Sequence, residues 1–99
     1  MEKKKVDFAI GIFDNLTEKG LEKIKLDINN SDVYGIGDYT DNVVINEFYT
    51  YPVNSLEKRM EVAKNIEGVN FVFPLNTSEP EKVKEIIRNE FTKYLNQKK

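Results

Sequence analysis

The stretch GIFDNLTEKGLEKI, residues 11–24, joins the end of an apolar run to the first turns of a helix. Residues 6–13 upstream are mostly apolar, as expected of a strand covered on both faces. Downstream, apolar residues recur at helical spacing, and either Asn15 or Thr17 can cap the helix. In many α/β proteins such a junction holds a phosphate, because unpaired N–H groups and the helix dipole favour an anion there. The stretch therefore predicts an α/β fold with a candidate anion site.

The rest of the chain repeats the strand-then-helix pattern twice. Residues 33–37 and 69–75 have the composition of short strands. A helix opened by Asn54 or Ser55 precedes the second of these runs, and a helix with Pro80 in its first turn follows it. Residues 38–52, which join the strand at 33–37 to the helix opened by Asn54 or Ser55, predict an irregular loop, and loops of this length are often functional.

Three strands alternating with three helices predict a parallel sheet with right-handed crossovers. The expected fold class is α/β, a three-layer Rossmann-like sandwich with a short three-stranded parallel sheet in the order 3-2-1. The first two helices are expected on one face and the third on the other. Ligands are expected beyond the carboxyl ends of the strands, on a rim that carries Phe13, Asp14, the 38–52 loop and residues 75–78.

Composition narrows the classes of function. The 99 residues, with 15 basic and 17 acidic side chains, predict one small domain without the charge excess that captures nucleic acid or membrane surfaces. The sequence contains no cysteine and no histidine, which excludes disulfides, the usual zinc sites and imidazole catalysis. The charged N-terminus and its short apolar run do not fit a signal peptide or a membrane span, so we expect a cytoplasmic protein.

Three segments resemble the cytidylyltransferase-like nucleotidyltransferases. GIFDNLTEKG is similar to their first strand and turn, which ends Gly-Thr-Phe-Asp before a His-x-Gly-His motif. SDVYGIGDYTD resembles their second strand, and YPVNSLEKRMEVAKNIEGVNFVFPL resembles the helix and third strand that follow, with Arg59 in a Glu-x-Arg context. The similarity spans most of residues 4–75 and is closest to the short bacterial glycerol-3-phosphate cytidylyltransferase type. It implies CTP with Mg²⁺ as ligands and transfer of a nucleotidyl group to a phosphorylated alcohol.

The chain departs from this family at the groups that act on phosphate. Aligned without a gap, the two histidines of the motif fall on Thr17 and Gly20. With one residue inserted, the glycine of the motif falls on Gly20 and its second histidine on Leu21. Neither alignment restores a histidine. The family's loop lysines fall near Phe48 and Thr50, and two further strands are missing after the last helix. Each lost transition-state donor costs about 2.7–4 kcal/mol. We therefore expect residues 1–99 to be a single truncated and degenerate domain that retains nucleotide or phosphate binding without efficient transfer.

Eight residues are candidates for ligand binding, while no catalytic residue or metal ligand is assigned. They are Gly11, Ile12, Phe13, Asp14, Thr17, Lys19, Gly20 and Arg59. Gly11 either lets a phosphate approach the backbone or relieves crowding, and Arg59 either binds a phosphate or pairs with a carboxylate. Asp14, Thr17 and Lys19 either contribute to ligand binding or have structural roles, Asp14 as a turn residue, Thr17 as a helix cap and Lys19 as a solvated side chain.

Two other functions remain open on the same residues. The first strand, residues 6–13, is expected at an edge of the sheet, and unprotected apolar edges recruit other strands. This predicts a non-catalytic module that forms a homo-oligomer or binds a partner through that edge or through the last helix, with Phe91 and Tyr94. A further possibility is one half of a split nucleotidyltransferase, which a second polypeptide completes.

Overall fold

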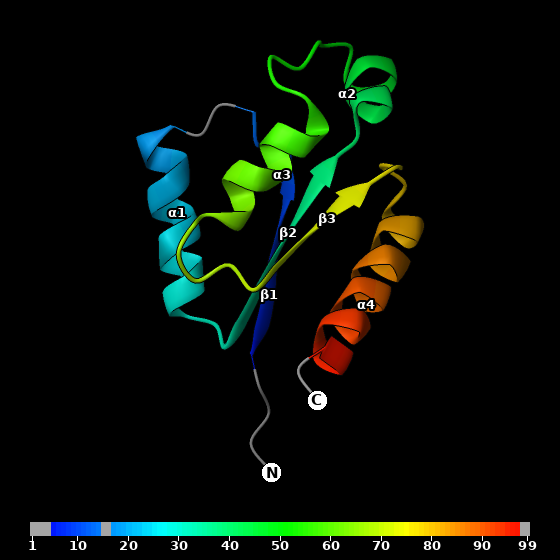
Figure 1. Cartoon of the computed structure of the whole chain (residues 1–99). Coiled ribbons are helices and arrows are strands. Elements are labelled where there is room, and N and C mark those ends of the chain that lie inside the picture. The colour runs from blue at the N-terminus through cyan, green and yellow to red at the C-terminus, as the bar shows by residue number, and fades with distance from the viewer. Residues whose placement is uncertain (1–4, 15–16, 98–99) are drawn as a thin grey trace.

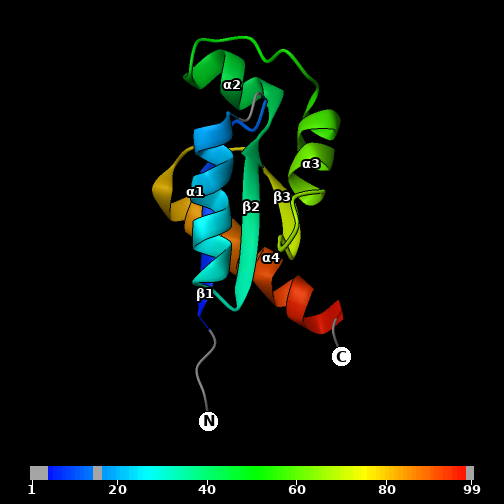
Figure 2. The same ribbon diagram turned by 90° about the vertical axis from the view of Figure 1, so that its left-hand side faces the viewer.

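The computed structural model describes residues 5–14 and 17–97. Three strands form one parallel sheet in the order β1-β2-β3: β1 (Val6–Gly11), β2 (Val33–Tyr39) and β3 (Phe71–Leu75). The helices are α1 (Glu18–Asn29), α2 (Asp41–Glu47), α3 (Leu56–Lys64) and α4 (Pro80–Gln97). Helices α1 and α3 cover one face of the sheet and α4 covers the other (Figures 1 and 2). The three-layer α/β architecture and the strand order are confirmed.

The prediction of three helices is wrong, because α2 lies inside the segment expected to be a loop. Its seven residues, Asp41–Glu47, begin after Thr40, and Val43 and Val44 are buried. A helix of two turns is too short for apolar periodicity to reveal it. The strand boundaries also shift: β1 ends at Gly11, β2 continues to Tyr39 and β3 begins at Phe71.

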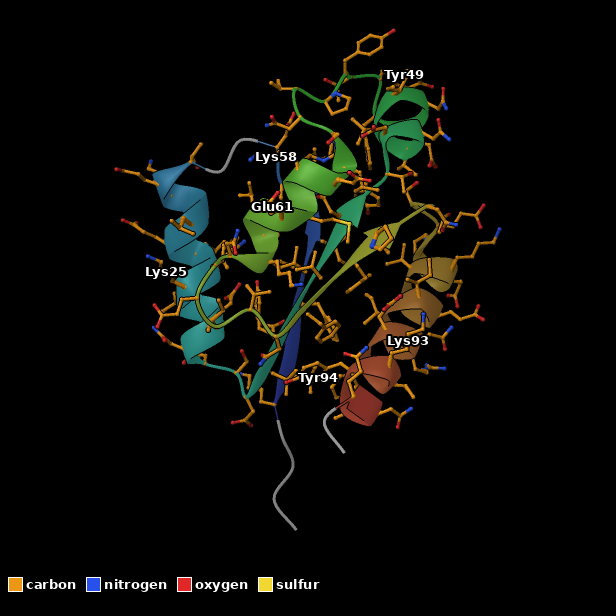
Figure 3. All side chains as sticks on the ribbon, viewed as in Figure 1. Lys25, Tyr49, Lys58, Glu61, Lys93 and Tyr94 are labelled. Atoms are coloured by element: carbon orange, nitrogen blue, oxygen red, sulfur yellow. The ribbon has the colours of Figure 1, made fainter. Side chains whose placement is uncertain are left out.

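The two faces of the sheet carry separate apolar clusters. The α1 and α3 side contains a core of five buried residues: Phe13, Ile24, Tyr34, Ile36 and Ala63. The α4 side is aromatic, with Phe71 stacked between the rings of Phe73, Phe91 and Tyr94. In Figure 3 the Tyr94 side chain accordingly lies between α4 and the sheet. Phe91 and Tyr94, expected at an interface, therefore also pack within the chain.

Side-chain caps fix the starts of two helices. The Thr17 Oγ1 accepts a hydrogen bond from the Gly20 N–H at 3.1 Å, and the Ser55 Oγ accepts one from the Lys58 N–H at 3.3 Å. Both caps were among the predicted alternatives, and Asn15 lies outside the described residues. Within the part of the chain that the structure describes, no helix is long and apolar enough to cross a bilayer.

Candidate functional site

Arg59 is the centre of a buried polar network at the carboxyl end of the sheet. It lies in the second turn of α3, and its side chain is fully buried. The Nε lies 3.3 Å from Asp38 Oδ1, and Nη1 lies 2.8 Å from Asp41 Oδ1. Nη1 also donates to the Asn54 carbonyl at 2.7 Å, and Nη2 donates to the Tyr39 carbonyl at 2.6 Å. One guanidinium therefore joins β2, α2 and the segment before α3.

Asp38 and Arg59, the two charged residues at the middle of this network, are both fully buried, and each shifts the pKa of the other. Asp38 is 0% exposed, and burial raises its pKa to about 6 although the Arg59 charge and hydrogen bond act to lower it. Its Oδ2 has no hydrogen-bond partner of ordinary geometry among the described residues. Burial acts to lower the pKa of Arg59, but hydrogen bonds and charges from Asp41 and Asp38 raise it, so the guanidinium stays charged.

Asp14 ties the turn after β1 to the same network. Its carboxylate accepts hydrogen bonds from the backbone N–H of Val53 and, at 2.8 Å, from that of Asn54. The Asn54 Nδ2 donates to the Asp14 carbonyl at 3.2 Å. Burial acts to raise the pKa of Asp14, but the hydrogen bonds from Val53 and Asn54 outweigh it and the pKa is lowered. Asp14 thus stays ionised and holds the segment that Arg59 also binds.

A cavity of about 420 Å³ opens on the other side of this turn, between β1 and α1. Four of the eight predicted site residues line it: Gly11, Ile12, Phe13 and Gly20. Helix α1 adds Lys23 and Asp27 to its wall. Lys23 is exposed and forms no ion pair with any described residue. The wall of the cavity therefore includes two glycines, which carry no side chain, and one lysine that forms no ion pair with any described residue.

Tyr34 on β2 also lines the cavity and carries an unused polar group. Its side chain is 1% exposed, and the hydroxyl finds no hydrogen-bond partner within residues 5–14 and 17–97. Burial raises the pKa of Tyr34 to about 12, and the charges of Asp27 and Asp7 act in the same direction. The hydroxyl is therefore neutral and remains a potential donor.

Gly11 differs from the packed glycines of the sheet. A Cβ built on Gly11 would meet its nearest neighbour, the Phe13 ring, at 4.0 Å, which is ordinary contact. A Cβ on Gly35 would lie 2.6 Å from the Phe71 ring, and one on Gly37 would lie 2.8 Å from Leu75. Packing therefore accounts for glycine at positions 35 and 37. It does not account for glycine at position 11, where a side chain would instead enter the cavity.

The other predicted residues lie apart from this cavity. Lys19 is exposed in the first turn of α1 and does not line it. Thr17 uses its hydroxyl as the cap of α1, while Asp14 and Arg59 belong to the buried network. The structure thus brings four of the eight residues together around one space and places two in a separate set of contacts.

The partners of Arg59 were not identified from the sequence. One signal was present, because Asp38 follows the apolar run VYGIG and a buried carboxylate requires a partner. The spacing to Arg59 is 21 residues, which no helix or turn periodicity encodes. Lys23 and Tyr34 were also missed, since each is an ordinary member of its helix or strand in the sequence.

The segment between α2 and α3 exposes apolar side chains at the same end of the molecule. Tyr49 is 88% exposed, with a φ of 54°, and Tyr51 and Val53 are 81% and 84% exposed. Figure 3 shows Tyr49 projecting away from the body of the molecule. The hydrogen bonds to Asp14 fix the end of this segment nearest α3.

Comparisons with known proteins place the fold. No protein-family model matches the chain, and no curated protein matches it. Among solved structures, it is similar to the lipopolysaccharide core biosynthesis protein from Thermoplasma volcanium GSS1, with a TM-score of 0.72 and 16% sequence identity. The match covers 82% of this chain, which spans 66% of the length of that structure. At this identity the likeness shows a shared α/β fold alone.

Proposed function

We propose that this chain binds the phosphates of a nucleotide, CTP with Mg²⁺ in the first instance, at the cavity between β1 and α1. One observation carries the proposal: Gly11 leaves open a space that packing does not require, beside the unpaired Lys23. Backbone without side chains allows close approach of an anion, and a lysine supplies a compact positive charge. Gly20 in the first turns of α1 extends the same wall.

The residues present fit Mg²⁺ that arrives on the nucleotide. Within the described residues no group of three or more acidic side chains could hold a metal ion. Mg²⁺ commonly keeps several waters and is bound through substrate phosphates with one or two carboxylates, so a dedicated protein cage is not needed. Asp27 is the carboxylate that lines the cavity.

We further propose that the isolated chain does not transfer nucleotidyl groups efficiently. Transfer requires donors aimed at the charge that develops on the phosphoryl group. The guanidinium of Arg59 is bound by two carboxylates and two carbonyls, so its donors already have partners. The sequence has no histidine to replace it, and each absent donor costs about 2.7–4 kcal/mol.

Titration calorimetry with CTP, CDP-glycerol and ATP in the presence of Mg²⁺ tests the binding. We expect saturable binding of CTP in the micromolar range. Gly11→Val, which fills the space, and Lys23→Ala, which removes the cation, should each weaken it by about tenfold or more, equivalent to about 1.4 kcal/mol. Lys25→Ala is the matched control, because Lys25 lies on the same helix and does not line the cavity (Figure 3).

Two results would contradict the proposal. Binding would be refuted if none of the three ligands gave a saturable signal, or if Lys25→Ala weakened binding as much as Lys23→Ala. Pyrophosphate release from CTP and glycerol phosphate by the purified chain would refute the second part, since it would show that transfer survives without histidine.

A further inference from the structure

The open edge of β1 presents unpaired backbone groups. In the order β1-β2-β3, β1 has one neighbour, and the Lys5 carbonyl accepts a hydrogen bond from the Val33 N–H at 3.2 Å. Successive peptide groups of an extended strand point to opposite sides. The backbone groups of Val6, Phe8 and Ile10 therefore point away from β2, toward the space beside the sheet.

A cavity lies on each side of this edge. On the α4 side, a cavity of about 320 Å³ is lined by Val6, Phe8, Lys84, Ile87, Arg88 and Phe91. On the α1 side lies the cavity of about 420 Å³ that includes Gly11. Side chains of a strand alternate between its two faces. An extended segment paired with β1 would therefore direct alternate side chains into the two cavities.

The chemistry of the α4 cavity defines what fits it. Phe8, Ile87 and Phe91 give it an apolar lining, and Lys84 and Arg88 add two positive charges. Neither cation forms an ion pair with any residue that the structure describes. An apolar side chain flanked by carboxylates complements this lining. A second copy of the chain, paired antiparallel through β1, would instead place its Lys84 and Arg88 beside the same two cations.

Asp7 protects the edge from indiscriminate pairing. Its carboxylate accepts a hydrogen bond at 2.8 Å from the N–H of Phe8, which is the central residue of the three that face outward. Natural proteins commonly blunt edge strands with charged groups. A docking segment must displace Asp7 with its own carbonyl, so sequences without further favourable contacts are rejected.

We propose that the open edge of β1 is the docking site for an extended segment of a partner protein that carries an apolar residue with an acidic residue two positions before it and another two positions after it, all three on one face of the segment. The segment adds a fourth strand, its apolar side chain packs against Ile87 and Phe91, and its carboxylates pair with Lys84 and Arg88. Main-chain hydrogen bonds supply affinity in such strand addition, and alternate side chains supply specificity. The segment's other side chains face the Gly11 cavity, so peptide binding is measured without nucleotide, and its outcome does not depend on whether that cavity binds phosphate.

A synthetic peptide tests the proposal on the whole chain. The probe is the pentapeptide Glu-Thr-Val-Thr-Glu, in which both glutamates and the valine share one face of an extended strand, and it carries a fluorophore for anisotropy. A second peptide has lysine in place of both glutamates. We expect the acidic peptide to bind at least about tenfold more tightly than the basic one, equivalent to about 1.4 kcal/mol.

Two variants locate the contact. Ile10→Pro removes an outward N–H at an edge position where proline is tolerated, and it should abolish binding of the acidic peptide. Arg88→Glu should reverse the preference toward the basic peptide. Lys93→Glu makes the same charge change elsewhere on α4, outside the cavity, and should leave the preference unchanged (Figure 3).

Three outcomes would overturn the proposal. They are absence of saturable peptide binding, equal affinity for the acidic and basic peptides, and binding that Ile10→Pro and Arg88→Glu leave intact. Light scattering supplies the remaining check, because a wild-type dimer that Ile10→Pro converts to monomer would identify a second copy as the occupant.

Discussion

The Arg59 network lies at the carboxyl end of the sheet, the Gly11 cavity extends along β1 and α1, and the Arg59 and Lys23 cations of the two regions differ in how far the fold engages them. The guanidinium of Arg59 is engaged by four internal acceptors, so the fold itself accounts for this arginine. In the cavity, Lys23 has no ionic partner and the Tyr34 hydroxyl has no hydrogen bond within the described residues. The contacts of Arg59 are therefore explained by stability, while the open space at Gly11 beside the unpaired Lys23 supports the proposed ligand site.

Arg59→Ala gives the strongest test of this contrast. Removing the cation leaves Asp38 buried without its partner and frees two carbonyls, which should lower the free energy of unfolding by about 3–5 kcal/mol. Urea denaturation measures the change. Adding Asp38→Asn to Arg59→Ala should recover part of the loss, because the uncompensated charge is then absent. An Arg59→Ala chain as stable as wild type would show that the network does not hold the connections together.

The pH dependence of stability tests the burial of Asp38. Its pKa is raised from 3.8 to about 6 in the folded chain, so between these values the folded state binds a proton that the unfolded state has released. The contribution of Asp38 to stability should therefore fall, by about 3 kcal/mol, as pH rises through this window, and stay constant above it. Asp38→Asn should remove this slope in urea titrations at several pH values. Asp14, whose pKa is lowered, acts below pH 3.8 and in the opposite direction.

A pair of glycine substitutions compares packed and open backbone directly. Gly37→Ala places a methyl group 2.8 Å from Leu75 and should destabilise the chain by about 1–3 kcal/mol. Gly11→Ala meets no atom closer than 4.0 Å and should change stability by no more than about 0.5 kcal/mol. Thermal melts of the two variants supply the comparison. A large loss for Gly11→Ala would return this glycine to a structural role and remove support for the phosphate site.

Thr17→Ala should lower stability much less than Arg59→Ala. It removes the side-chain acceptor of the Gly20 N–H at the start of α1, which typically costs about 1 kcal/mol. Thr17→Ser keeps the acceptor and should remain close to wild type in a thermal melt. If Thr17→Ala lowered CTP affinity much more than Thr17→Ser at temperatures where both are folded, the hydroxyl would belong to the site as well as to the cap.

The sequence predicted features that depend on neighbours along the chain and missed those that depend on distant ones. Strand order, layering and the caps at Thr17 and Ser55 follow from local periodicity and capping chemistry, and the structure confirms them. Helix α2 was missed because two turns leave no periodic signal. The partners of Arg59 come from β2, α2 and the segment before α3, and only the packed sheet brings them together.

The candidate site was predicted in part for the same reason. Gly11, Ile12, Phe13 and Gly20 lie within one junction, so a local motif sufficed to group them. Lys23 and Tyr34 line the same cavity only because α1 packs against the sheet with Lys23 facing β1 and because β2 pairs with β1, and neither contact can be read from a local motif. Arg59 was a candidate for binding either phosphate or a carboxylate, because its burial could not be read from its position in an otherwise polar helix, and the structure pairs it with Asp38 and Asp41.

The direction of the first strand and the last helix has a practical consequence for surface-based measurements. The start of β1 and the end of α4 lie at the same end of the molecule, opposite α2 and the turn after β1 (Figure 1). A biosensor tether attached beyond either element would present the carboxyl end of the sheet to the flowing analyte. Immobilisation through Lys23 on α1 would instead turn the face that carries the cavity between β1 and α1 toward the chip.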